Sequence, residues 1–387
     1  MTTATEPATA LPTIPVMKPW LGEEEAAAAA EAVTSGWVAQ GPRVRAFEQE
    51  FAQRVAAAEG VAVSNCTTGL HLALHLLGVG AGDEVVVPSF SFIATANAAR
   101  YVSATPVFAD VDPVTGNLTA ETVGAVLTER TRAVIVVHQA GVPADTRPLY
   151  ALLESRGIAV VEDAACAIGS TLYGAPVGAG IDLGVFSFHP RKLVTTGEGG
   201  MLVTRHFDWA ARARRLREHG MSASAAERHA NGSVAPEQYL EPGFNFRMTD
   251  VQAAIGRVQL GRLDAMVARR RRLADRYRSM LADLPGLRMV GDPDWGTTNY
   301  QSCWVLLPED FPVSRDDLLE EFTRAGISPR RGIMAAHLEP AYADLPRVEL
   351  PVTERLTSDS LILPLFHQMT EDDQDRVVDV LRDVASR

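Results

Sequence analysis

The sequence predicts an α/β protein, with a largely parallel sheet in a large domain and a smaller α/β domain after it. Seven short runs rich in β-branched residues alternate with longer segments of helical spacing, and strands that alternate with helices form parallel sheets covered by those helices. The chain has 387 residues, which is enough for two hydrophobic cores. The seven expected strands are residues 61–64, 84–88, 106–110, 133–137, 158–161, 184–188 and 201–204.

The segments between these strands have the length and the apolar spacing of helices. The expected helices are residues 68–77, 91–101, 120–127 and 147–155. Ligands of such sheets bind beyond the carboxyl ends of the strands. The residues that follow each strand are therefore the candidates for chemistry.

A change of pattern marks the expected domain boundary. After a polar, glycine-containing stretch at 222–242, a long helical pattern extends from 249 to 284. We expect a flexible tail at 1–13, a large domain at 14–248, and this long helix with a small C-terminal domain at 249–387. The elements expected in the small domain are a strand at 303–307 and acidic amphipathic helices at 315–324 and 371–385.

Composition excludes several classes of partner. The formal net charge of −12 disfavours binding to nucleic acid or to an anionic membrane, because both carry the same sign as the protein. No run of about 20 apolar residues could span a bilayer, and the first residues do not resemble a signal peptide. Cys66, Cys166 and Cys303 are far apart, which argues against a disulfide framework or a thiolate zinc site. We expect a cytoplasmic protein whose partners are small molecules or proteins.

Two further patterns are interpreted as structural. The four arginines at 269–272 have acidic neighbours, so we interpret them as a solvated helix face and not as a nucleic-acid patch. His71 and His75 have the spacing of a helical metal pair, but the glutamate of a zinc-protease helix is missing between them. We expect a packed helix face there, and no metal site in the protein.

Lysine is almost absent from the chain: among 36 basic residues, the lysines are Lys18 and Lys192. Arginine can replace lysine as a solvated charge, but it cannot readily form a Schiff base with a carbonyl. Lys192 lies just beyond an expected strand, and a glycine-rich turn follows it. We interpret it as a nucleophilic amine whose pKa would be lowered by burial or by the neighbouring Arg191. The alternative is a purely structural β-turn-β connection.

Asp163 follows the expected strand at 158–161, so it should face the same cleft as Lys192. A carboxylate in that position can keep a ring nitrogen protonated, which turns a pyridine into an electron sink. The alternative role is to cap a following helix, which aspartate also favours.

Other strand ends carry groups that suit a flat, phosphorylated ligand. Thr67 and Thr68 lie where a strand passes into a helix, and hydroxyl and backbone N–H groups at a helix N-terminus can bind phosphate. Ser187 ends another strand and could bind it too. Phe90 and Phe92 close a further strand, where a ring could stack on a cofactor. Helix capping and core packing are the respective alternatives.

Together these stretches resemble the DegT/DnrJ/StrS family of pyridoxal-phosphate sugar aminotransferases. The resemblance covers nearly the whole chain and depends on seven segments in a fixed order. They are residues 35–42, 64–74, 87–97, 106–112, 162–165, 187–200 and 245–254.

The resemblance implies an aspartate-aminotransferase-like fold with a seven-stranded sheet. It implies pyridoxal 5'-phosphate as cofactor, with pyridoxamine phosphate as intermediate. Lys192 would form the Schiff base, Asp163 would pair with the pyridine nitrogen and Phe92 would stack on the ring. Asn245 matches a residue that reaches the cofactor phosphate of the neighbouring subunit, which implies a homodimer with shared active sites. The phosphate ligands within the subunit would be Thr67, Thr68 and Ser187.

The sequence departs from that family at three places. Cys66 stands where many relatives have glycine, and Cys166 stands where many have glutamine or histidine near the cofactor ring hydroxyl. The segment 327–337 replaces a tyrosine-containing sequence near the substrate. The groups that it offers to an anionic substrate are Arg330, Arg331 and His337.

By this resemblance, the protein moves an amino group from glutamate or glutamine to a nucleotide-activated keto-sugar for amino-sugar biosynthesis. Two other reactions use the same machinery: amination of a cyclitol or other non-nucleotide ketone, and sugar dehydration, for which relatives carry histidine at the lysine position. The non-enzymatic alternative is a regulatory binding module of the same fold. Lys192 and Asp163 argue against that module, because mere binding needs neither an amine nor an electron sink.

Overall fold

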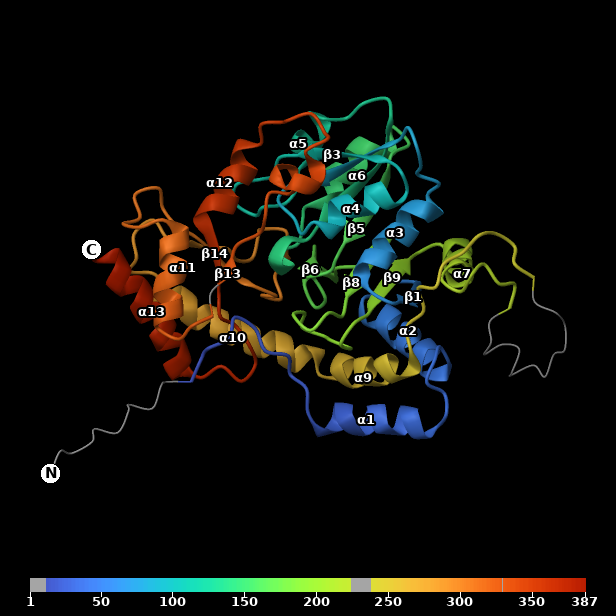
Figure 1. Ribbon diagram of the computed structural model, residues 1–387, viewed down its shortest axis with the longest axis horizontal. Coiled ribbons are helices and arrows are strands. Elements are labelled where there is room, and N and C mark those ends of the chain that lie inside the picture. The colour runs from blue at the N-terminus through green and yellow to red at the C-terminus, as the bar shows by residue number, and fades with distance from the viewer. Residues whose placement is uncertain (1–11, 224–237, 329) are drawn as a thin grey trace.

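The computed structural model describes residues 12–223, 238–328 and 330–387 (Figure 1). Its large domain contains a seven-stranded sheet in the order β1-β9-β8-β5-β4-β2-β3, and neighbours are parallel except where β9 pairs with β1 and β8. All seven expected strands form, so the predicted fold class is confirmed. They are β1 Glu59–Val63, β2 Glu84–Pro88, β3 Thr105–Ala109, β4 Thr131–Val137, β5 Ala159–Asp163, β8 Gly184–Ser187 and β9 Gly200–Thr204.

Helices cover both faces of this sheet because successive strand residues point to opposite sides. On one face, Val61 and Val63 pack with α3, α4 and α7; on the other, Ala62 packs with α2 and α9, while Val86 packs with α5 and α6. Helix α1 lies outside α9 (Figure 1). The helices that precede α9 are α1 Glu23–Thr34, α2 Pro42–Arg54, α3 Cys66–Leu76, α4 Ala94–Tyr101, α5 Ala120–Gly124, α6 Thr146–Glu154 and α7 Phe207–Leu216.

The single long helix expected at 249–284 is wrong: the segment forms α9 Asp250–Gly261 and α10 Leu263–Met280. The break falls at Arg262, which pairs with Glu24 and Glu25 of α1 and lies over the Trp20 ring. Helix α9 contributes to the core of the large domain, and α10 contributes Leu273 and Tyr277 to the second core. The two cores therefore meet along these helices, whereas the domain division at 248–249 stays a prediction.

The arginine run within α10 does not form the solvated face that we expected. Arg270 is 4% exposed and donates hydrogen bonds to the carbonyls of Tyr300 and Gln301, while Arg269 donates to those of His367 and Met369. Arginine can saturate several carbonyls at once because it presents five N–H groups in a fixed fork. These side chains thus tie α10 to the second domain.

The second domain has a four-stranded sheet in the order β10-β12-β14-β13, flanked by α11 and α13. The expected strand and both acidic helices form. Ile14 pairs with Ile327 and packs in this second core, whereas residues 1–11 of the expected tail lie outside the described ranges. The elements are β10 Arg288–Met289, β12 Cys303–Leu306, α11 Arg315–Arg324, β13 Arg330–Arg331, η2 Ala336–Leu338, η3 Pro340–Tyr342, α12 Pro351–Asp359, β14 Ser360–Leu363 and α13 Glu371–Ala385.

A small three-stranded sheet, β11-β6-β7, connects the two parts. Its strands are β6 Thr171–Leu172, β7 Ala175–Pro176 and β11 Gly296–Thr297, and a short helix η1 spans Gln139–Gly141. Across the described ranges, no helix is long and apolar enough to cross a membrane.

Candidate active site

Six strands of the large sheet, β3 among them, place their carboxyl ends at one edge. The parallel strands β2, β4, β5 and β8 run in the same direction, and β1 runs with them because β9 is antiparallel to both β1 and β8. Asp163 ends β5, Ser187 ends β8 and Asn65 follows β1. The topology therefore gathers the sequence-predicted groups at the edge where ligands of such sheets bind.

Asp163 is buried, at 5% exposure, and its carboxylate is held by two donors. The Ala165 N–H donates to Oδ1 over 3.1 Å, and the Thr95 hydroxyl donates to Oδ2 over 3.0 Å. Burial raises the pKa of Asp163, although both hydrogen bonds, Lys192 and His138 act to lower it. Oδ2 keeps a free acceptor site, so the group can still accept a hydrogen bond from a ligand. No helix follows Asp163, so capping is not its role.

The adjacent Glu162 points away from Asp163, as alternation along a strand requires. Its carboxylate bonds His138 Nε2 over 3.0 Å and accepts the Tyr150 hydroxyl over 3.0 Å. The Ala144 N–H donates to His138 Nδ1, which leaves Nε2 to donate to Glu162. Glu162 is thus used within the fold, and Asp163 is the acid of this pair that serves the site.

Lys192 lies close to both cysteines of the site and to Asp163. Its Nζ is 3.0 Å from Cys166 Sγ. Burial lowers the pKa of Lys192, but Cys166, Cys66 and Asp163 favour the ammonium form, and the pKa lies above the ordinary lysine value. The lowered pKa expected from burial and Arg191 is therefore wrong for the cofactor-free chain. Neither cysteine could be placed beside the amine from the sequence alone.

Cys66 completes a compact cluster with Asp163, Cys166 and Lys192. Its Sγ is 4.0 Å from Asp163 Oδ1. Burial and the Asp163 charge raise the pKa of the Cys66 thiol well above its ordinary value. Cys66 is thereby kept as a neutral thiol, which adds no charge beside the carboxylate.

The start of α3 offers donors to a phosphate. Asn65 caps the helix by accepting the Thr68 N–H over 2.9 Å, and the Thr68 hydroxyl bonds back to Asn65. Thr67, by contrast, has a hydroxyl with no hydrogen-bond partner among the described residues. The Ser187 hydroxyl accepts only a long bond of 3.4 Å, from the His189 N–H. Thr67 and Ser187 therefore have free bonding capacity, whereas Thr68 is engaged in capping.

Gly200, at the start of β9, lets the glycine-rich turn approach this helix end. A Cβ on Gly200 would lie 2.7–2.8 Å from the backbone of Asn65 and Cys66. Any larger residue would push the turn away from α3. The glycine thus keeps the turn close to the start of α3.

The two phenylalanines after β2 have different environments. Phe90 is fully buried against Trp304, with ring centroids 5.3 Å apart, so it is a core residue. The Phe92 side chain is 61% exposed and available for stacking on a ligand. Asn245 is also exposed, and its backbone forms an isolated antiparallel β-bridge with Glu218. Asn245 is therefore accessible without any change in the core.

The structure separates the three groups proposed for an anionic substrate. Arg330 on β13 is half-buried, and its pKa is lowered by burial and by the charge of Arg191. Arg331 points to the exposed side of the same strand. His337 is only 3% exposed: Nδ1 lies 2.6 Å from Ser89 Oγ, and Nε2 lies 3.3 Å from Glu354 Oε1. These contacts favour Arg330 and leave His337 to join α12 to the end of β2.

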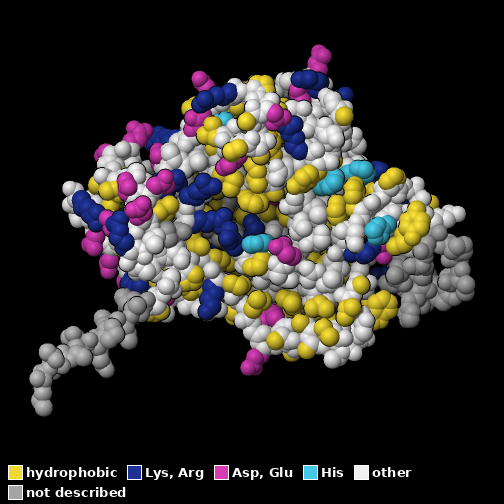
Figure 2. Space-filling view, in the orientation of Figure 1, with side chains coloured by type: hydrophobic (Ala, Val, Ile, Leu, Met, Phe, Trp, Pro, Cys, Tyr) yellow, Lys and Arg dark blue, Asp and Glu magenta, His cyan; other side chains and the backbone are white. Residues whose placement is uncertain are grey.

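Positive charge gathers around Arg330 and Lys192. The pKa of His189 is lowered by burial and by Lys192, Arg191 and Arg330, while Glu198 opposes the shift. Neither Arg191 nor Arg330 has a carboxylate partner among the described residues. Figure 2 shows a group of lysine and arginine side chains at a hollow near the middle of the face, next to a histidine. This unpaired charge, in a protein of net charge −12, suits a bound anion.

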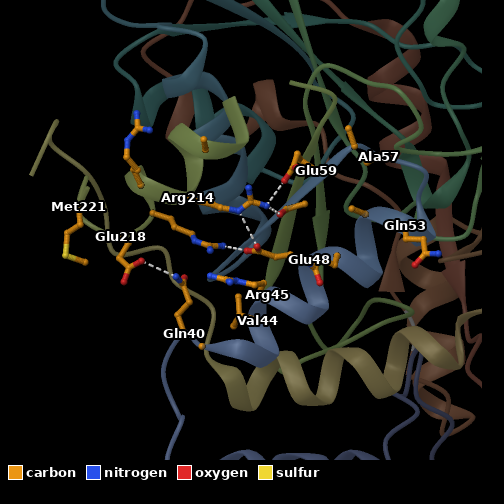
Figure 3. A pocket seen from close by; sticks show the side chains of 18 of the residues that line it. Gln40, Val44, Arg45, Glu48, Gln53, Ala57, Glu59, Arg214, Glu218 and Met221 are labelled. Carbon is orange, nitrogen blue, oxygen red and sulfur yellow. Dashed lines mark hydrogen bonds and ion pairs between the residues drawn. The ribbon is translucent and has the colours of Figure 1, made fainter. Parts of the chain in front are cut away.

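A cavity of about 810 Å³ lies elsewhere, between α2 and α7 (Figure 3). None of the predicted site residues lines it. Its wall contains Glu48, which accepts hydrogen bonds from Arg217 and from the Ala62 N–H, and Arg214, which also pairs with Glu59. These charges compensate one another, so the cavity has the character of a structural network and not of the reactive centre.

The residues gathered at the sheet edge fit a pyridoxal phosphate molecule. Lys192 would provide an amine for its carbonyl, Asp163 a buried acceptor for its ring nitrogen, and Phe92 an uncovered ring. Thr67, Ser187 and the free N–H groups at the start of α3 can donate to its phosphate. Among the described residues, no three His, Cys, Asp or Glu side chains form a group that could hold a metal ion.

Comparisons with known proteins agree with this arrangement. The model of the DegT/DnrJ/EryC1/StrS aminotransferase family matches residues 19–382. Aminotransferase TlmJ from Streptoalloteichus hindustanus is 39% identical, with a TM-score of 0.89 over 96% of this chain and 99% of that one. DesI, solved with its TDP-sugar product, is 35% identical, with a TM-score of 0.87 over 98% and 95%. The sugar aminotransferase Spr1654 from Streptococcus pneumoniae, solved in a PLP form, is 26% identical, with a TM-score of 0.90 over 97% and 99%.

Proposed function

Since the chain belongs to the DegT/DnrJ/EryC1/StrS aminotransferase family and is a pyridoxal-phosphate-dependent aminotransferase, we propose that it aminates a keto-sugar. The amino group would come from glutamate or glutamine, and the sugar would be nucleotide-activated. One observation carries the proposal: Lys192 and Asp163 come from separate strand ends into one cluster, where Asp163 lies against Cys66 and Lys192 lies against Cys166. A binding module would need neither the amine nor the buried acid.

Asp163 would hold a proton on the pyridine nitrogen. Its two hydrogen bonds fix the carboxylate within a buried setting, where an ion pair with a cationic ring is strong. Pyridoxal phosphate, when bound, supplies an electron sink for the carbon from which a proton is removed. The acid thus sustains the sink and does not itself transfer the proton.

Lys192 would hold the cofactor between turnovers and act as acid and base during them. Its Nζ must lose a proton before it attacks a carbonyl, and Asp163 and the thiols favour the protonated form. Neutralisation of the Asp163 charge by the ring nitrogen would weaken that preference. Lys192 could then move a proton between the cofactor and the substrate carbon.

The remaining groups would orient the reactants. Thr67 and Ser187 would bind the cofactor phosphate together with the N-terminus of α3, and Phe92 would cover the ring. Arg330 would bind an anionic group of the substrate. The TDP-sugar product of DesI, a relative 35% identical, supports a nucleotide-linked sugar as that substrate.

The exposed Asn245 supports a homodimer in which each subunit completes the site of the other. We further propose that the enzyme acts in the cytoplasm, where its nucleotide sugars and amino acids are available. Sedimentation of the purified protein should give twice the mass of the chain, and a monomer that is fully active would contradict the shared site.

The experiment supplies the purified enzyme with glutamate, or with glutamine labelled in its amide or amine nitrogen, and then with a panel of ketones. The expected result is a product that carries label from the α-amine, formed with a nucleotide-linked keto-sugar and not with the free sugar. Amination of a cyclitol alone would replace the proposed acceptor. Loss of a hydroxyl without incorporated nitrogen would indicate a dehydratase, and a protein that gains no absorbance band with pyridoxal phosphate would be a binding module.

A further inference from the structure

Gln301 lies in the connection between β11 and β12, far from Lys192 in the sequence, yet it contacts the backbone on both sides of that lysine. The Leu193 N–H donates to Gln301 Oε1 over 3.0 Å, and Gln301 Nε2 donates to the Arg191 carbonyl over 2.5 Å. One carboxamide therefore joins the peptide groups before and after Lys192. The lysine is held by a side chain from outside its own loop.

Asn299, two residues earlier, holds Cys166, the residue whose side chain contacts that of Lys192. Its Nδ2 donates to the carbonyls of Cys166 and Ile168, each over 2.8 Å, and its Oδ1 accepts the Gln301 N–H over 2.7 Å. The turn from Asn299 to Gln301 thus fixes the backbone of Cys166 as well as that of Lys192. The side chains of these two residues meet over 3.0 Å.

This turn is buried and is itself anchored. Asn299 is 0% exposed and Gln301 is 7% exposed. Arg270 donates from Nε to the Tyr300 carbonyl and from Nη2 to that of Gln301, over 2.6 and 2.7 Å. Tyr300 has a φ of +51°, a backbone conformation that persists in a non-glycine residue when its surroundings determine it. The anchor comes from α10, so the lysine loop is connected to the second domain.

We propose that Gln301 is a positioning residue for Lys192. By bridging the peptide groups beside the lysine, it sets where Nζ lies relative to Cys166 and to the carbonyl that Nζ attacks. The inference depends on the proposed role of Lys192. A catalytic group displaced by about 1 Å can lose roughly a hundredfold in rate, so two backbone hydrogen bonds are enough to matter.

The test compares Gln301→Leu with Gln374→Leu in the holoenzyme. Gln374 is also fully buried and donates to one backbone carbonyl, that of Leu273, but it lies in the core of the second domain. Both variants lose a buried amide, so both should lower the thermal midpoint. Only a positioning role predicts that Gln301→Leu also changes properties of Lys192.

Three readouts follow Lys192. The first is the pH midpoint of the lysine-bound cofactor absorbance, which we expect to move by about half a pH unit or more in Gln301→Leu. The second is the single-turnover rate with an α-deuterated donor, expected to fall roughly 10- to 100-fold with a larger isotope effect. The third, made on the cofactor-free chain, is hydrogen exchange of 189–196, expected to become roughly tenfold faster. Gln374→Leu should leave all three unchanged.

Gln301→Glu provides a variant of similar size should the leucine variant fail to fold. It keeps the acceptor for the Leu193 N–H and loses the donor to the Arg191 carbonyl, so its effects should be intermediate or equal to those of leucine. The inference is wrong if the Gln301 variant that folds differs from wild type only in thermal midpoint, as Gln374→Leu does. If wild type shows no cofactor band that borohydride fixes on Lys192, the proposed function itself is wrong.

Discussion

Two buried clusters of charge differ in how completely their members are paired. Around the cavity between α2 and α7, Glu48 bonds Arg217, Arg214 and the Ala62 N–H, so this carboxylate and both of these guanidinium groups have an opposite charge beside them. At the sheet edge, the Lys192 amine contacts a thiol and not a carboxylate. The first cluster lines a cavity of about 810 Å³, but incomplete pairing makes the second cluster the candidate for the reactive site.

Replacing Lys192 by alanine gives the largest effect that this comparison predicts. In the proposed function this amine holds the cofactor and moves the proton, so multiple turnovers and the yellow absorbance band should both be lost, with a fall in rate of roughly 10²–10⁴-fold or more. Absorbance spectra and steady-state assays measure this. Lys18→Ala is the control and should match wild type; a Lys192→Ala protein that keeps both band and turnover would remove Lys192 from the site.

Replacing Glu48 by glutamine should act on stability instead. Arg217 is 4% exposed and would be left without its carboxylate, and breaking a buried pair in this way costs about 3–5 kcal/mol of unfolding free energy. Urea denaturation measures the loss. The absorbance of the bound cofactor should remain at temperatures where the variant is folded.

The exposed pair Arg257–Glu50 provides the matched control. Arg257→Gln should cost no more than about 1 kcal/mol, because water already solvates both groups. Equal losses of unfolding free energy in Glu48→Gln and Arg257→Gln would show that the buried ion pair of Glu48 contributes no more to stability than an exposed pair.

Replacing Arg330 by glutamine tests whether the unpaired cations serve a substrate. A hydrogen bond to a charged group is worth about 1.5–3 kcal/mol, so KM for an anionic substrate should rise roughly 10- to 100-fold with a smaller change in kcat. Arg331 lies on the exposed side of the same strand, and Arg331→Gln should stay within about twofold of wild type. If both variants behaved alike, specific anion binding by Arg330 would be contradicted.

Much of the site could be predicted from the sequence because its residues follow strands. Asp163 ends one β-branched strand and Lys192 follows another within five residues, and the parallel order of the strands then places them together. The scarcity of lysine made Lys192 conspicuous. Such signals are local, and they survive without knowledge of tertiary packing.

Other features depend on contacts between distant segments and carry no local pattern. Glutamine is usually an exposed residue, so the sequence gives no sign that Gln301 is buried. Only the structure shows that its side chain bonds the peptide groups on both sides of Lys192. The raised pKa of Lys192 could not be predicted without knowing that Cys166 and Cys66 lie beside it, and these cysteines follow two other strands. The break between α9 and α10 at Arg262 likewise involves a distant segment, because Glu24 and Glu25 of α1 pair with that arginine.

The smallest predicted effect concerns the pH response of the unpaired cluster. Burial and three nearby cations lower the pKa of His189 below 6.5, so the unfolded chain takes up a proton at this residue first as the pH falls. His189 therefore reduces stability as the pH drops from its unfolded pKa through its folded one. Arg330→Gln removes one cation and should raise the folded pKa toward 6.5, which narrows that pH range. Titration of the His189 ring signal by NMR, assigned with His189→Asn, measures the shift; a pKa that stays in place would mean that Arg330 does not face this histidine.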